Sequence, residues 1–493
     1  MKNIIKIHPT DSLALAIDDL QKGDIVSVGN EKIELINDIP SGHKFAITAI
    51  SEGDDIVKYG APMGRAIANI AIGEHIHTHN TKTRLSKIEE YEYKPNFAEI
   101  AKEEPLFFDG FIRDNGEVGI RNDIWIIPSV GCVNKTAENL AKYLDRNKPS
   151  HIDSVLALTH PYGCSQLGED HLCTQKLLAA LVHHPNAAGV LVVGLGCENN
   201  TLESFKEIIG DYDSNRVKFM ITQDEEDELE RGRELIDELA EYATKFKSEK
   251  VSISKLKIGL KCGASDGFSG VSANPLLGAL SDKLISMGGT SILTEVPEMF
   301  GAEHLLMERC PTKEIFEKCV KMINDFKEYF IKHDQVVYEN PSPGNKKGGI
   351  TTLEDKSLGC TQKGGTSKVV DVIEYADTVK KPGLNLLSGP GNDIVAVTAL
   401  IASGAHIVLF TTGRGTPLGG PAPTVKVSTN TKLSINKKNW IDFDAGVLLT
   451  GTPMNECRDS FMDYLLEVAS GKFTCAEENG YQEISIFKDG IIL

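Results

Sequence analysis

The chain of 493 residues is too long for a single hydrophobic core, and its length predicts about three domains. Its composition, with 41% hydrophobic and 25% charged residues, is typical of a globular protein. The formal net charge of −18 argues against a nucleic-acid-binding protein and against a protein of anionic membrane surfaces, so an anionic substrate would need a local group of Lys and Arg.

Neither a signal peptide nor a membrane span is expected. The N-terminal stretch MKNIIKIHPTDSLALAI is interrupted by charged and polar residues, and no apolar run approaches the ~18 residues of a span. The ten cysteines are scattered at long intervals, which is typical of thiols that stay reduced. We therefore expect a cytoplasmic protein.

Residues 1–80 are predicted to form a small β-rich domain. Short apolar runs separated by Gly, Asn and Pro favour strands joined by turns, and these runs are DIVSVG, EKIELIN, KFAITAI and DDIVKYG. Residues 81–108 are charged, weakly periodic and contain two prolines, so we interpret them as a linker.

The stretch GEHIHTHN, residues 73–80, contains three of the thirteen histidines at every second position. On an extended strand His75, His77 and His79 would lie on one face, with the outer pair roughly 13 Å apart at the backbone. Two neighbouring imidazoles can bind one metal ion, and zinc, iron, copper, nickel and manganese are all suitable. An exposed polar strand face is the alternative, although the flanking Gly and turn residues favour a site.

Residues 109–250 are predicted to form an α/β domain with a parallel sheet. Continuous apolar runs indicate strands buried on both faces, and these runs are IWIIPSV (124–130), SVLALTH (154–160), GVLVVGLG (189–196) and VKFMIT (217–222). Helical stretches follow the strands, as in βαβ units.

A Gly-Cys pair follows each of the first three of these strands, and the cysteines are Cys132, Cys164 and Cys197. In a parallel sheet such positions gather at the carboxyl ends of the strands, where ligands bind. A thiol at a helix N-terminus also has a lowered pKa. The three thiols can therefore be read as ligands of a metal or an iron–sulfur cluster, or as small apolar fillers of tight turns.

Residues 251–493 are predicted to form a C-terminal α/β domain of two further units, separated by the loop-rich segment 340–365. None of its loops has the spacing of a dinucleotide-binding or Walker A motif, so a nucleotide cofactor is not expected. The predicted fold class is thus α/β multidomain, with a small β-rich N-terminal domain followed by parallel-sheet α/β units.

Polar loops in this domain combine Gly, Ser, Thr and Asn with isolated charges. They contain Lys261 and Glu295 near two strand ends, Lys356 in the loop-rich segment and Arg414 after the last long strand. Such a set suits a polyhydroxylated anion such as a sugar acid, and Arg binds a carboxylate through two parallel hydrogen bonds. For any one of these residues, a loop cap or a solvated charge is the alternative.

Many stretches resemble the altronate/galactarate dehydratase family, in the family's order and over nearly the whole chain. They include GEHIHTHN, FDGFIRDNGEVGIRN, PSVGCVN, THPYGCSQLGED, LKCGASDGFSG, EVPEMFGAEHLLM, SPGNKKGGITTLEDKSLGC and FTTGRGTP. The resemblance implies dehydration of a hexonate to a 2-keto-3-deoxy sugar acid, with a divalent metal, Fe2+ or Mn2+, as cofactor. It also implies an N-terminal SAF-type (β-clip) domain, and the family's His-x-His-Asn pattern falls on His77, His79 and Asn80.

The implied reaction needs a Lewis acid at the developing enediolate, a base for the C2 proton and an acid for the departing C3 hydroxyl. We expect His75, His77 and His79 to supply metal ligands. His43, in IPSGHKFAI of the same domain, is expected to be a further ligand or a proton-transfer group.

Lys261 and Glu295 are the candidates for proton transfer, and Lys356 and Arg414 are the candidates for binding the substrate carboxylate. The stretches GGITTLEDKSLGCTQKGG and GPGNDIVAVTALIASG are more similar to the altronate branch of the family than to the galactarate branch. Asp393 in the second stretch would repel the second carboxylate of galactarate. We therefore expect D-altronate to be converted to 2-keto-3-deoxy-D-gluconate, as in hexuronate catabolism, with galactarate or another sugar acid as the alternative substrate.

Two other functions are compatible with the sequence. One is an iron–sulfur hydro-lyase that uses Cys132, Cys164 and Cys197. The other is a non-catalytic sugar-acid sensor, for which a metal-binding histidine strand is superfluous. The expected partner is a small-molecule sugar acid, with no nucleic acid and no membrane, and assembly as a homodimer is left open.

Overall fold

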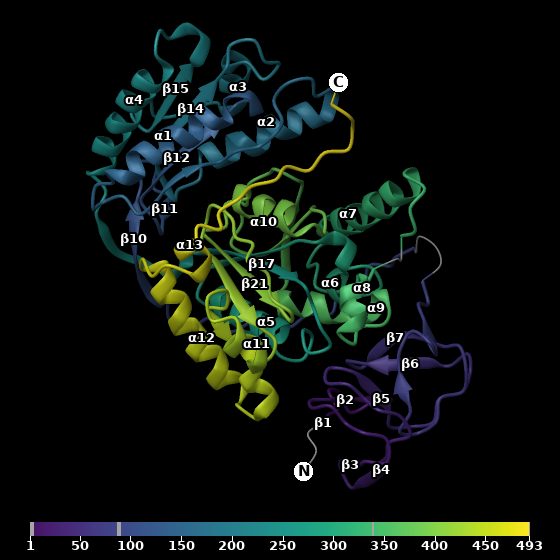
Figure 1. Cartoon of the computed structure of the whole chain (residues 1–493). Helices are drawn as coiled ribbons and strands as arrows, with labels where there is room; N and C mark the ends of the chain where they lie inside the picture. The colour runs from purple at the N-terminus through teal and green to yellow at the C-terminus, as the bar shows by residue number, and fades with distance from the viewer. Residues whose placement is uncertain (1–3, 86–89, 338–339, 493) are drawn as a thin grey trace.

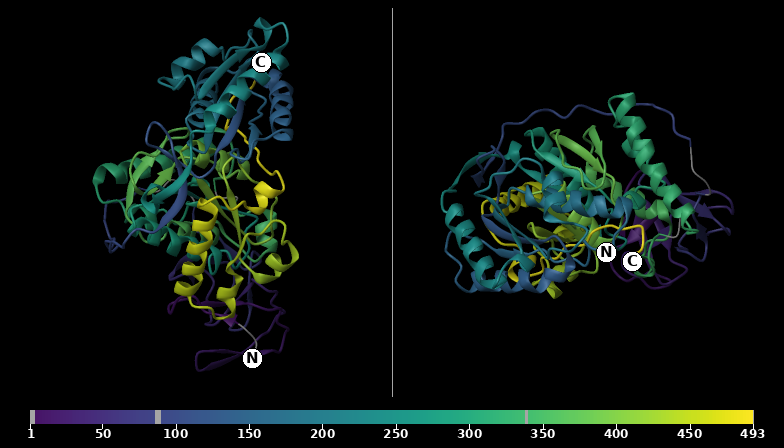
Figure 2. Two further views of the ribbon diagram at one scale, coloured as in Figure 1. Left: turned by 90° about the vertical axis from the view of Figure 1, so that its left-hand side faces the viewer. Right: turned by 90° about the horizontal axis from the view of Figure 1, so that it is seen from above.

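The structure is a computed structural model that describes residues 4–85, 90–337 and 340–492. Three regions are separated in space (Figure 1): the purple N-terminal domain at the lower right, a large central region, and a blue and teal region at the upper left. In the left view of Figure 2 the N-terminal domain and the blue and teal region lie at opposite ends of the molecule. The central region lies between the N-terminal domain and the blue and teal region.

The N-terminal domain consists of short antiparallel strands. They are β1 (Ile4–Ile5), β2 (Leu13–Ala16), β3 (Ile25–Val28), β4 (Glu31–Glu34), β5 (Lys44–Ala46), β6 (Asp55–Lys58), β7 (Ala61–Ala66), β8 (His75–Ile76) and β9 (Thr81–Lys82). Three sheets result, in the orders β1-β2-β5-β8, β3-β4 and β6-β7-β9. Alternate residues of β2 enter two different cores, since Leu13 and Leu15 pack on one side and Ala14 and Ala16 on the other.

A three-stranded antiparallel sheet joins the blue and teal region to the central region. It contains β10 (Phe107–Ile112), β11 (Val118–Gly119) and β16 (Ser248–Ser252), with β10 in the middle. The expected linker 81–108 thus begins and ends in strands, and its described residues 90–106 contain no helix or strand.

The blue and teal region is a parallel four-stranded sheet in the order β13-β12-β14-β15. Its strands are β12 (Asp123–Pro128), β13 (Val155–Ala157), β14 (Ala187–Gly194) and β15 (Val217–Ile221), and its helices are α1 (Asn134–Arg146), α2 (Gly168–Val182), α3 (Leu202–Ile209) and α4 (Glu228–Ala243). α1 and α4 pack on one face, and α2 and α3 on the other. Every residue of β14 is buried, as expected for a central parallel strand.

The central region contains one parallel seven-stranded sheet in the order β19-β20-β18-β17-β21-β22-β23. Its strands are β17 (Lys257–Gly263), β18 (Thr290–Leu293), β19 (Val369–Ile373), β20 (Gly383–Leu387), β21 (Ile407–Thr412), β22 (Thr424–Ser428) and β23 (Phe443–Asp444). The two α/β units expected after residue 250 therefore share a single sheet, because β17 pairs with both β18 and β21.

Helices cover both faces of this sheet. They are α5 (Ala273–Ser286), α6 (His304–Met307), α7 (Lys313–Lys332), α8 (Pro343–Lys347), α9 (Leu353–Cys360), α10 (Asp393–Ala402), α11 (Thr431–Asn436), α12 (Met454–Ala469) and α13 (Cys475–Glu478). Short 3-10 helices are η1 (Gly131–Val133), η2 (Thr222–Asp224), η3 (Ile253–Lys255), η4 (Val296–Glu298), η5 (Thr361–Gly364) and η6 (Ala445–Thr450). α5 and α12 share one core, whereas α10 packs on the other face together with α2.

The predicted fold class is confirmed: small antiparallel sheets come first and parallel-sheet α/β regions follow. The loop expected over 340–365 is wrong, because this segment contains α8, α9 and η5. Ser342 and Thr352 cap α8 and α9 by accepting hydrogen bonds from Asn345 N and Asp355 N. Such Ser and Thr caps are the local signal that predicts these helix starts.

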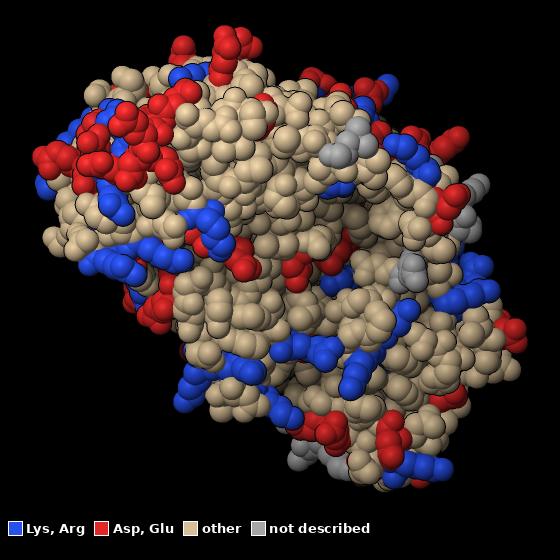
Figure 3. Space-filling view, turned by 45° about the horizontal axis from the view of Figure 1, so that its top comes forward, with Lys and Arg blue, Asp and Glu red and all other residues tan. Residues whose placement is uncertain are grey.

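Among the helices that the structure describes, none is long and apolar enough to cross a membrane. Figure 3 shows acidic side chains gathered at the upper left of the face it draws, and basic side chains across the middle and lower part, beside a hollow in the surface. The charges are therefore unevenly spread over this face, and both acidic and basic side chains lie beside the hollow.

Candidate active site

Four histidines of the N-terminal domain form one cluster. The ring centroid of His43 lies 5.2 Å from the centroids of both His75 and His77, and the His75 centroid lies 5.4 Å from that of His77 and 5.7 Å from that of His79. The closest contact joins Nδ1 of His43 to Nε2 of His75 at 3.0 Å. His43 enters the cluster because it directly precedes β5, which pairs antiparallel with β8.

A turn after β8 brings His79 back beside His75. The backbone N–H of His77 donates to Oδ1 of Asn80 at 3.0 Å, and Nδ2 of Asn80 donates to the carbonyl of His75 at 2.9 Å. The fully extended histidine strand that we expected is therefore wrong, since β8 ends at Ile76. The buried Asn80 side chain closes the turn, which gives a physical reason for an Asn directly after His-x-His.

The histidine cluster faces the central region across the domain boundary. Nε2 of His43 lies 3.3 Å from the carbonyl oxygen of Lys347, and Nε2 of His77 lies 2.9 Å from that of Lys346. A carbonyl only accepts, so a neutral ring carries its hydrogen on Nε2 and its lone pair on Nδ1. Nδ1 of His43 faces Nε2 of His75, and Nδ1 of His77 lies 3.2 Å from Oγ1 of Thr78. Backbone carbonyls at the end of α8 thus orient two imidazoles as they orient the metal-binding histidines of other proteins.

Burial keeps these imidazoles neutral. It lowers the pKa of His43, lowers the pKa of His75 to about 3 with help from the neighbouring His43 and His77, and lowers that of His77 to about 4. Neutral imidazole is the form that binds metals. Two nitrogens bound at about 2.1 Å to one octahedral ion lie about 3 Å apart, which is the spacing of the His43 and His75 nitrogens. The donor set therefore fits a divalent ion.

A buried triad fastens the N-terminal domain to the central region. The ammonium groups of Lys44 and Lys58 lie 2.9 and 2.8 Å from the two carboxylate oxygens of Asp355 in α9. Lys44 also donates to the carbonyl of Gly349 at 2.7 Å. Although burial opposes ionisation, the two lysines hold the pKa of Asp355 below its ordinary value. The histidines are therefore carried on a docked surface rather than on a free domain.

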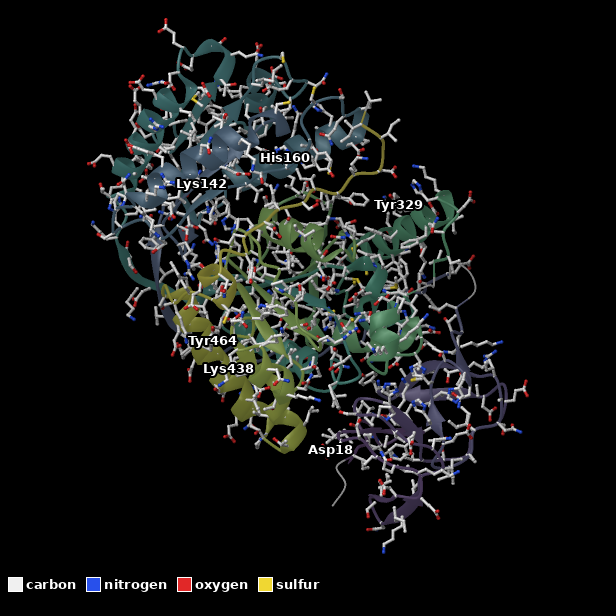
Figure 4. All side chains as sticks on the ribbon, in the orientation of Figure 1. Asp18, Lys142, His160, Tyr329, Lys438 and Tyr464 are labelled. Carbon is white, nitrogen blue, oxygen red and sulfur yellow. The ribbon has the colours of Figure 1, made fainter. Side chains whose placement is uncertain are left out.

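A cleft of about 540 Å³ lies between the two regions next to the histidines. Its charged lining residues come from both sides of the boundary and are Asp18, Asp19, Asp266, Lys347, Arg414 and Lys432. Figure 4 places Asp18 where the purple N-terminal domain meets the helices of the central region. Arg414 was expected to bind the substrate carboxylate, and this lining position gives its guanidinium access to an anion in the cleft.

A second group of charges is buried at the carboxyl ends of β17 and β18. Lys261 is ion-paired with Oε1 of Glu295, and its Nζ also lies 2.8 Å from Oδ1 of Asp393. Oε2 of Glu295 lies 3.1 Å from Nζ of Lys363. Despite burial, Glu295 and then Asp393 raise the pKa of Lys261 above its ordinary value. The Asp393 side chain is 39% exposed, so it connects the buried pair with the surface.

Cys262, Glu298 and Cys360 lie beside this pair and form the one group, among the described residues, whose metal-ligand atoms lie within 4.8 Å of one another. The cations next to them argue against a metal ion. Nζ of Lys363 lies 2.8 Å from Sγ of Cys262, and Nζ of Lys356 lies 3.2 Å from Glu298. A hydrogen bond from Cys360 and the charge of Lys363 lower the pKa of Cys262, and the lysine ammonium occupies the place beside this sulfur that a metal ion would need.

The structure thus brings the predicted residues together in two groups. His43 joins the histidines beside the cleft that Arg414 lines, and Lys261 meets Glu295 in the buried group. Lys356 belongs to the buried group, where its ammonium contacts Oγ of Ser265 at 2.8 Å. Asp266, which follows Ser265 in the chain, lines the cleft. The two groups are therefore neighbours along one loop.

Sequence reasoning assigned no role to several residues of this region, namely Lys44, Lys58, Asp355, Cys262, Glu298, Cys360 and Lys363. The contacts of Asp355 with Lys44 and Lys58 span 311 and 297 residues of sequence, and no local pattern signals them. Lys363 had one available signal, because it lies in the stretch DKSLGCTQKGG that carried the family resemblance.

Three family models match the chain. "Altronate/galactarate dehydratase SAF domain" matches residues 2–84, "D-galactarate dehydratase/Altronate hydrolase, second domain" matches residues 110–244, and "D-galactarate/Altronate dehydratase, C-terminal" matches residues 253–492. The first match ends just after the histidine cluster, and the cleft lies between the regions matched by the first and third models.

Full-length relatives agree with these matches. The chain is 53% identical to an altronate dehydratase of Escherichia coli over 492 residues, which cover 99% of each chain. It is 54% identical to an altronate dehydratase of Bacillus subtilis over 497 residues, covering 100% of both. It is 32% identical to an L-threo-forming galactarate dehydratase of Escherichia coli over 490 residues, covering 95% of this chain and 93% of the relative.

Proposed function

The chain belongs to the D-galactarate/altronate dehydratase family, and from this premise we propose that it is a hydro-lyase that converts D-altronate to 2-keto-3-deoxy-D-gluconate. Identity over the full length is higher to altronate dehydratases than to a galactarate dehydratase, which supports this substrate. The observation that carries the proposal is that His43 contacts the carbonyl of Lys347, a residue that lines the cleft together with Arg414, so that candidate metal ligands and a carboxylate partner lie close together.

The cofactor in this proposal is a divalent ion, Fe2+ or Mn2+, held by imidazole nitrogens of His75, His77 and His79. Nδ1 of His43 is a further ligand, or else exchanges protons with the substrate. When bound there, the ion supplies Lewis-acid stabilisation of charge on the substrate carboxylate and C2 oxygen. The neutral state of His43, His75 and His77 supports this assignment.

Arg414 orients the substrate. Its guanidinium binds the carboxylate of altronate through two parallel hydrogen bonds, which fixes C2 and C3 relative to the histidines. Lys347 and Lys432, the other cations of the cleft lining, raise the local concentration of the anion. Lys356 acts indirectly, because its ammonium is already paired with Glu298 and positions the loop at Ser265.

Proton transfer is assigned to the buried charges. Elimination removes the C2 proton and the C3 hydroxyl as water, and the resulting enol becomes the 2-keto product. Asp393 is the surface end of a chain of contacts that continues through Lys261 to Glu295. In the proposal the Lys261–Glu295 pair takes up the C2 proton. His43 protonates the departing hydroxyl after Nδ1 has itself taken up a proton, because the Nε2 hydrogen faces the carbonyl of Lys347.

Asp393 also accounts for substrate choice. A carboxylate at this half-exposed position repels the second carboxylate of galactarate, whereas the primary alcohol of altronate accepts a carboxylate as its hydrogen-bond partner. A galactarate dehydratase activity is the second candidate, supported by the shared family and the 32% identity to such an enzyme.

Mass spectrometry that detects the loss of one water from the substrate tests the proposal. Protein loaded with Fe2+ or Mn2+ is expected to convert D-altronate to a product lighter by one water, and protein stripped by a chelator is expected to be inactive until either ion returns. Absence of turnover of D-altronate by metal-loaded protein would overturn the proposed function.

A further inference from the structure

The three cysteines that follow β12, β13 and β14 are the exposed cysteines of the chain. All ten cysteines lie in the described residues, and the other seven are buried or partly buried. The interpretation of Cys132, Cys164 and Cys197 as apolar fillers of turns is therefore wrong, because apolar filler would be shielded from water. Cysteine is among the most buried residue types, so three exposed thiols at one edge of one sheet call for a function.

The loops that carry these thiols are bound to one another. The strands are neighbours in the order β13-β12-β14. The N–H of Gly131 donates to the carbonyl of Tyr162 at 2.8 Å, and the N–H of Asn200 donates to that of Gly163 at 2.9 Å. The N–H of Ser165 donates to Oδ1 of Asn199 at 2.8 Å. Each cysteine thus lies within two positions of a residue in this hydrogen-bond network. The network holds the three loops together as one surface.

Three helix N-termini point to the same surface. α1 begins two residues after Cys132, α2 four residues after Cys164 and α3 five residues after Cys197. α1 and α2 have no side-chain cap, since their N-cap residues are Val133 and Leu167, so their first N–H groups are not occupied by a side chain. Partial positive charge at these helix N-termini favours an anionic ligand between the three loops.

The thiols themselves have only weak partners. Sγ of Cys164 lies 3.9 Å from Oγ of Ser165, and Nε2 of Gln223 lies 3.8 Å from Sγ of Cys197. The nearby carboxylate of Glu198 is turned away, because it accepts hydrogen bonds from Ser129 Oγ and from the backbone N–H groups of residues 195 and 196. The sulfurs are therefore free to act as ligands, with amide and hydroxyl donors beside them.

The sulfurs are too far apart for all three cysteines to bind one ion. In the described chain these cysteines do not form a group whose ligand atoms lie within 4.8 Å of one another. One tetrahedral ion needs its thiolates that close, whereas an iron–sulfur cluster holds each cysteine on a different iron and spreads the ligands more widely. We propose that Cys132, Cys164 and Cys197 bind a four-iron, four-sulfide cluster, with the fourth iron left for a non-cysteine ligand such as water or a carboxylate.

This site is separate from the proposed active site. Figure 4 places His160, which precedes Cys164 by four residues, in the upper region and Asp18 of the cleft at the opposite end of the molecule. His160 supports the loop, since its buried ring lies 2.8 Å from the carbonyl of Pro128. The proposal of a cluster does not depend on the proposed function, because its test measures acid-labile sulfide rather than turnover.

The test uses the full chain, reconstituted without oxygen with ferrous iron and sulfide and then desalted. Wild-type protein is expected to retain about four acid-labile sulfide per chain, with about four iron in addition to the ion at the histidines, and to give an electron paramagnetic resonance signal after reduction. Cys132→Ser, Cys164→Ser and Cys197→Ser are each expected to lose most of the sulfide. Cys173→Ser is the matched control, because Cys173 lies on α2 of the same region and is partly buried.

Two further measurements keep the result specific. The double variant His77→Ala/His79→Ala is expected to keep its sulfide, which distinguishes a cluster from iron bound by the histidines. Alkylation mapped by mass spectrometry is expected to show the three cysteines protected in loaded protein and modified after chelation. Wild-type protein without acid-labile sulfide, or equal loss of sulfide in Cys173→Ser, would overturn the cluster.

Discussion

Nδ1 of His43 and Nε2 of His75, 32 residues apart in sequence, lie 3.0 Å from each other at the boundary between the N-terminal domain and the central region. Antiparallel pairing of β5 with β8 creates this contact. The other nitrogen of His43 faces the carbonyl of Lys347 in the central region. One imidazole thus connects the histidine cluster with the region that supplies the cations of the cleft.

The first prediction concerns the histidines of GEHIHTHN. Replacing both His77 and His79 with Ala is expected to abolish bound metal and dehydration of altronate, because two ligands are lost at once. The fold is expected to survive, since both side chains lie at the surface of the domain boundary. Metal analysis and circular dichroism measure this, with His8→Ala, an exposed histidine of the same domain, as the control. A double variant that keeps both metal and turnover would show that these histidines form only a polar surface.

Arg414 is predicted to determine affinity for the substrate. Arg414→Lys keeps the positive charge but loses the two parallel hydrogen bonds, so we expect KM for altronate to rise by about tenfold, or about 1.4 kcal/mol, with a smaller change in kcat. Steady-state kinetics provide the measurement. Lys438→Gln is the control, because Lys438 is a cation of the same region outside the lining of the cleft among the described residues. Equal KM values for wild type and Arg414→Lys would remove Arg414 from the substrate site.

Replacing Glu295 is predicted to lower kcat by more than a loss of protein stability would. Glu295→Gln keeps the shape but cannot accept a proton, so we expect kcat to fall by about 10²–10⁴. Glu303→Gln is a matched control, because Glu303 also forms a buried ion pair, with Lys327 at 2.7 Å. Both variants are expected to lose stability, measured by thermal unfolding, but only the first to lose kcat. If the two variants lose kcat equally, Glu295 has a structural role only.

Asp355 is predicted to hold the two regions together. Asp355→Asn leaves the buried ammonium groups of Lys44 and Lys58 without a counter-charge, so we expect the free energy of unfolding to fall by about 3–5 kcal/mol. Denaturant titration measures this loss. Glu234→Gln removes an exposed ion pair with Arg231 and is expected to change stability little. A loss for Asp355→Asn no larger than for this control would contradict the anchoring role.

The pH dependence of stability follows from the same carboxylate. The pKa of Asp355 in the folded protein lies below its ordinary value of 3.8, so the stabilisation is fully present above pH 3.8 and is lost as the pH falls further. Asp355→Asn is therefore expected to show a shallower decline of stability below this pH than wild type. Thermal unfolding at a series of acidic pH values would reveal the difference, and parallel curves would refute it.

The strands and the parallel sheets could be predicted from sequence because their apolar runs are local signals. β14, for example, is a continuous apolar run and is buried at every position. Lys261 and Glu295 were predicted as proton-transfer candidates near two strand ends, and the parallel pairing of β17 with β18 brings them into contact. The roles assigned to these residues stay predictions.

Other features depend on contacts that sequence spacing does not encode. A turn at Asn80 is found where an extended histidine strand was expected, because a side-chain hydrogen bond of Asn80 competes with strand pairing. The contact of Lys356 with Glu298 joins residues that are far apart in sequence, and the predicted role of Lys356 in substrate binding stays a prediction. Asp355 meets Lys44 and Lys58 only after two regions dock, which no periodicity signals.

A competition between two substrates tests the central claim most directly. Metal-loaded protein receives D-altronate and galactarate at equal concentration, and mass spectrometry follows both. We expect preferential consumption of D-altronate with formation of 2-keto-3-deoxy-D-gluconate, because the second carboxylate of galactarate meets Asp393. Preferential consumption of galactarate would contradict the account.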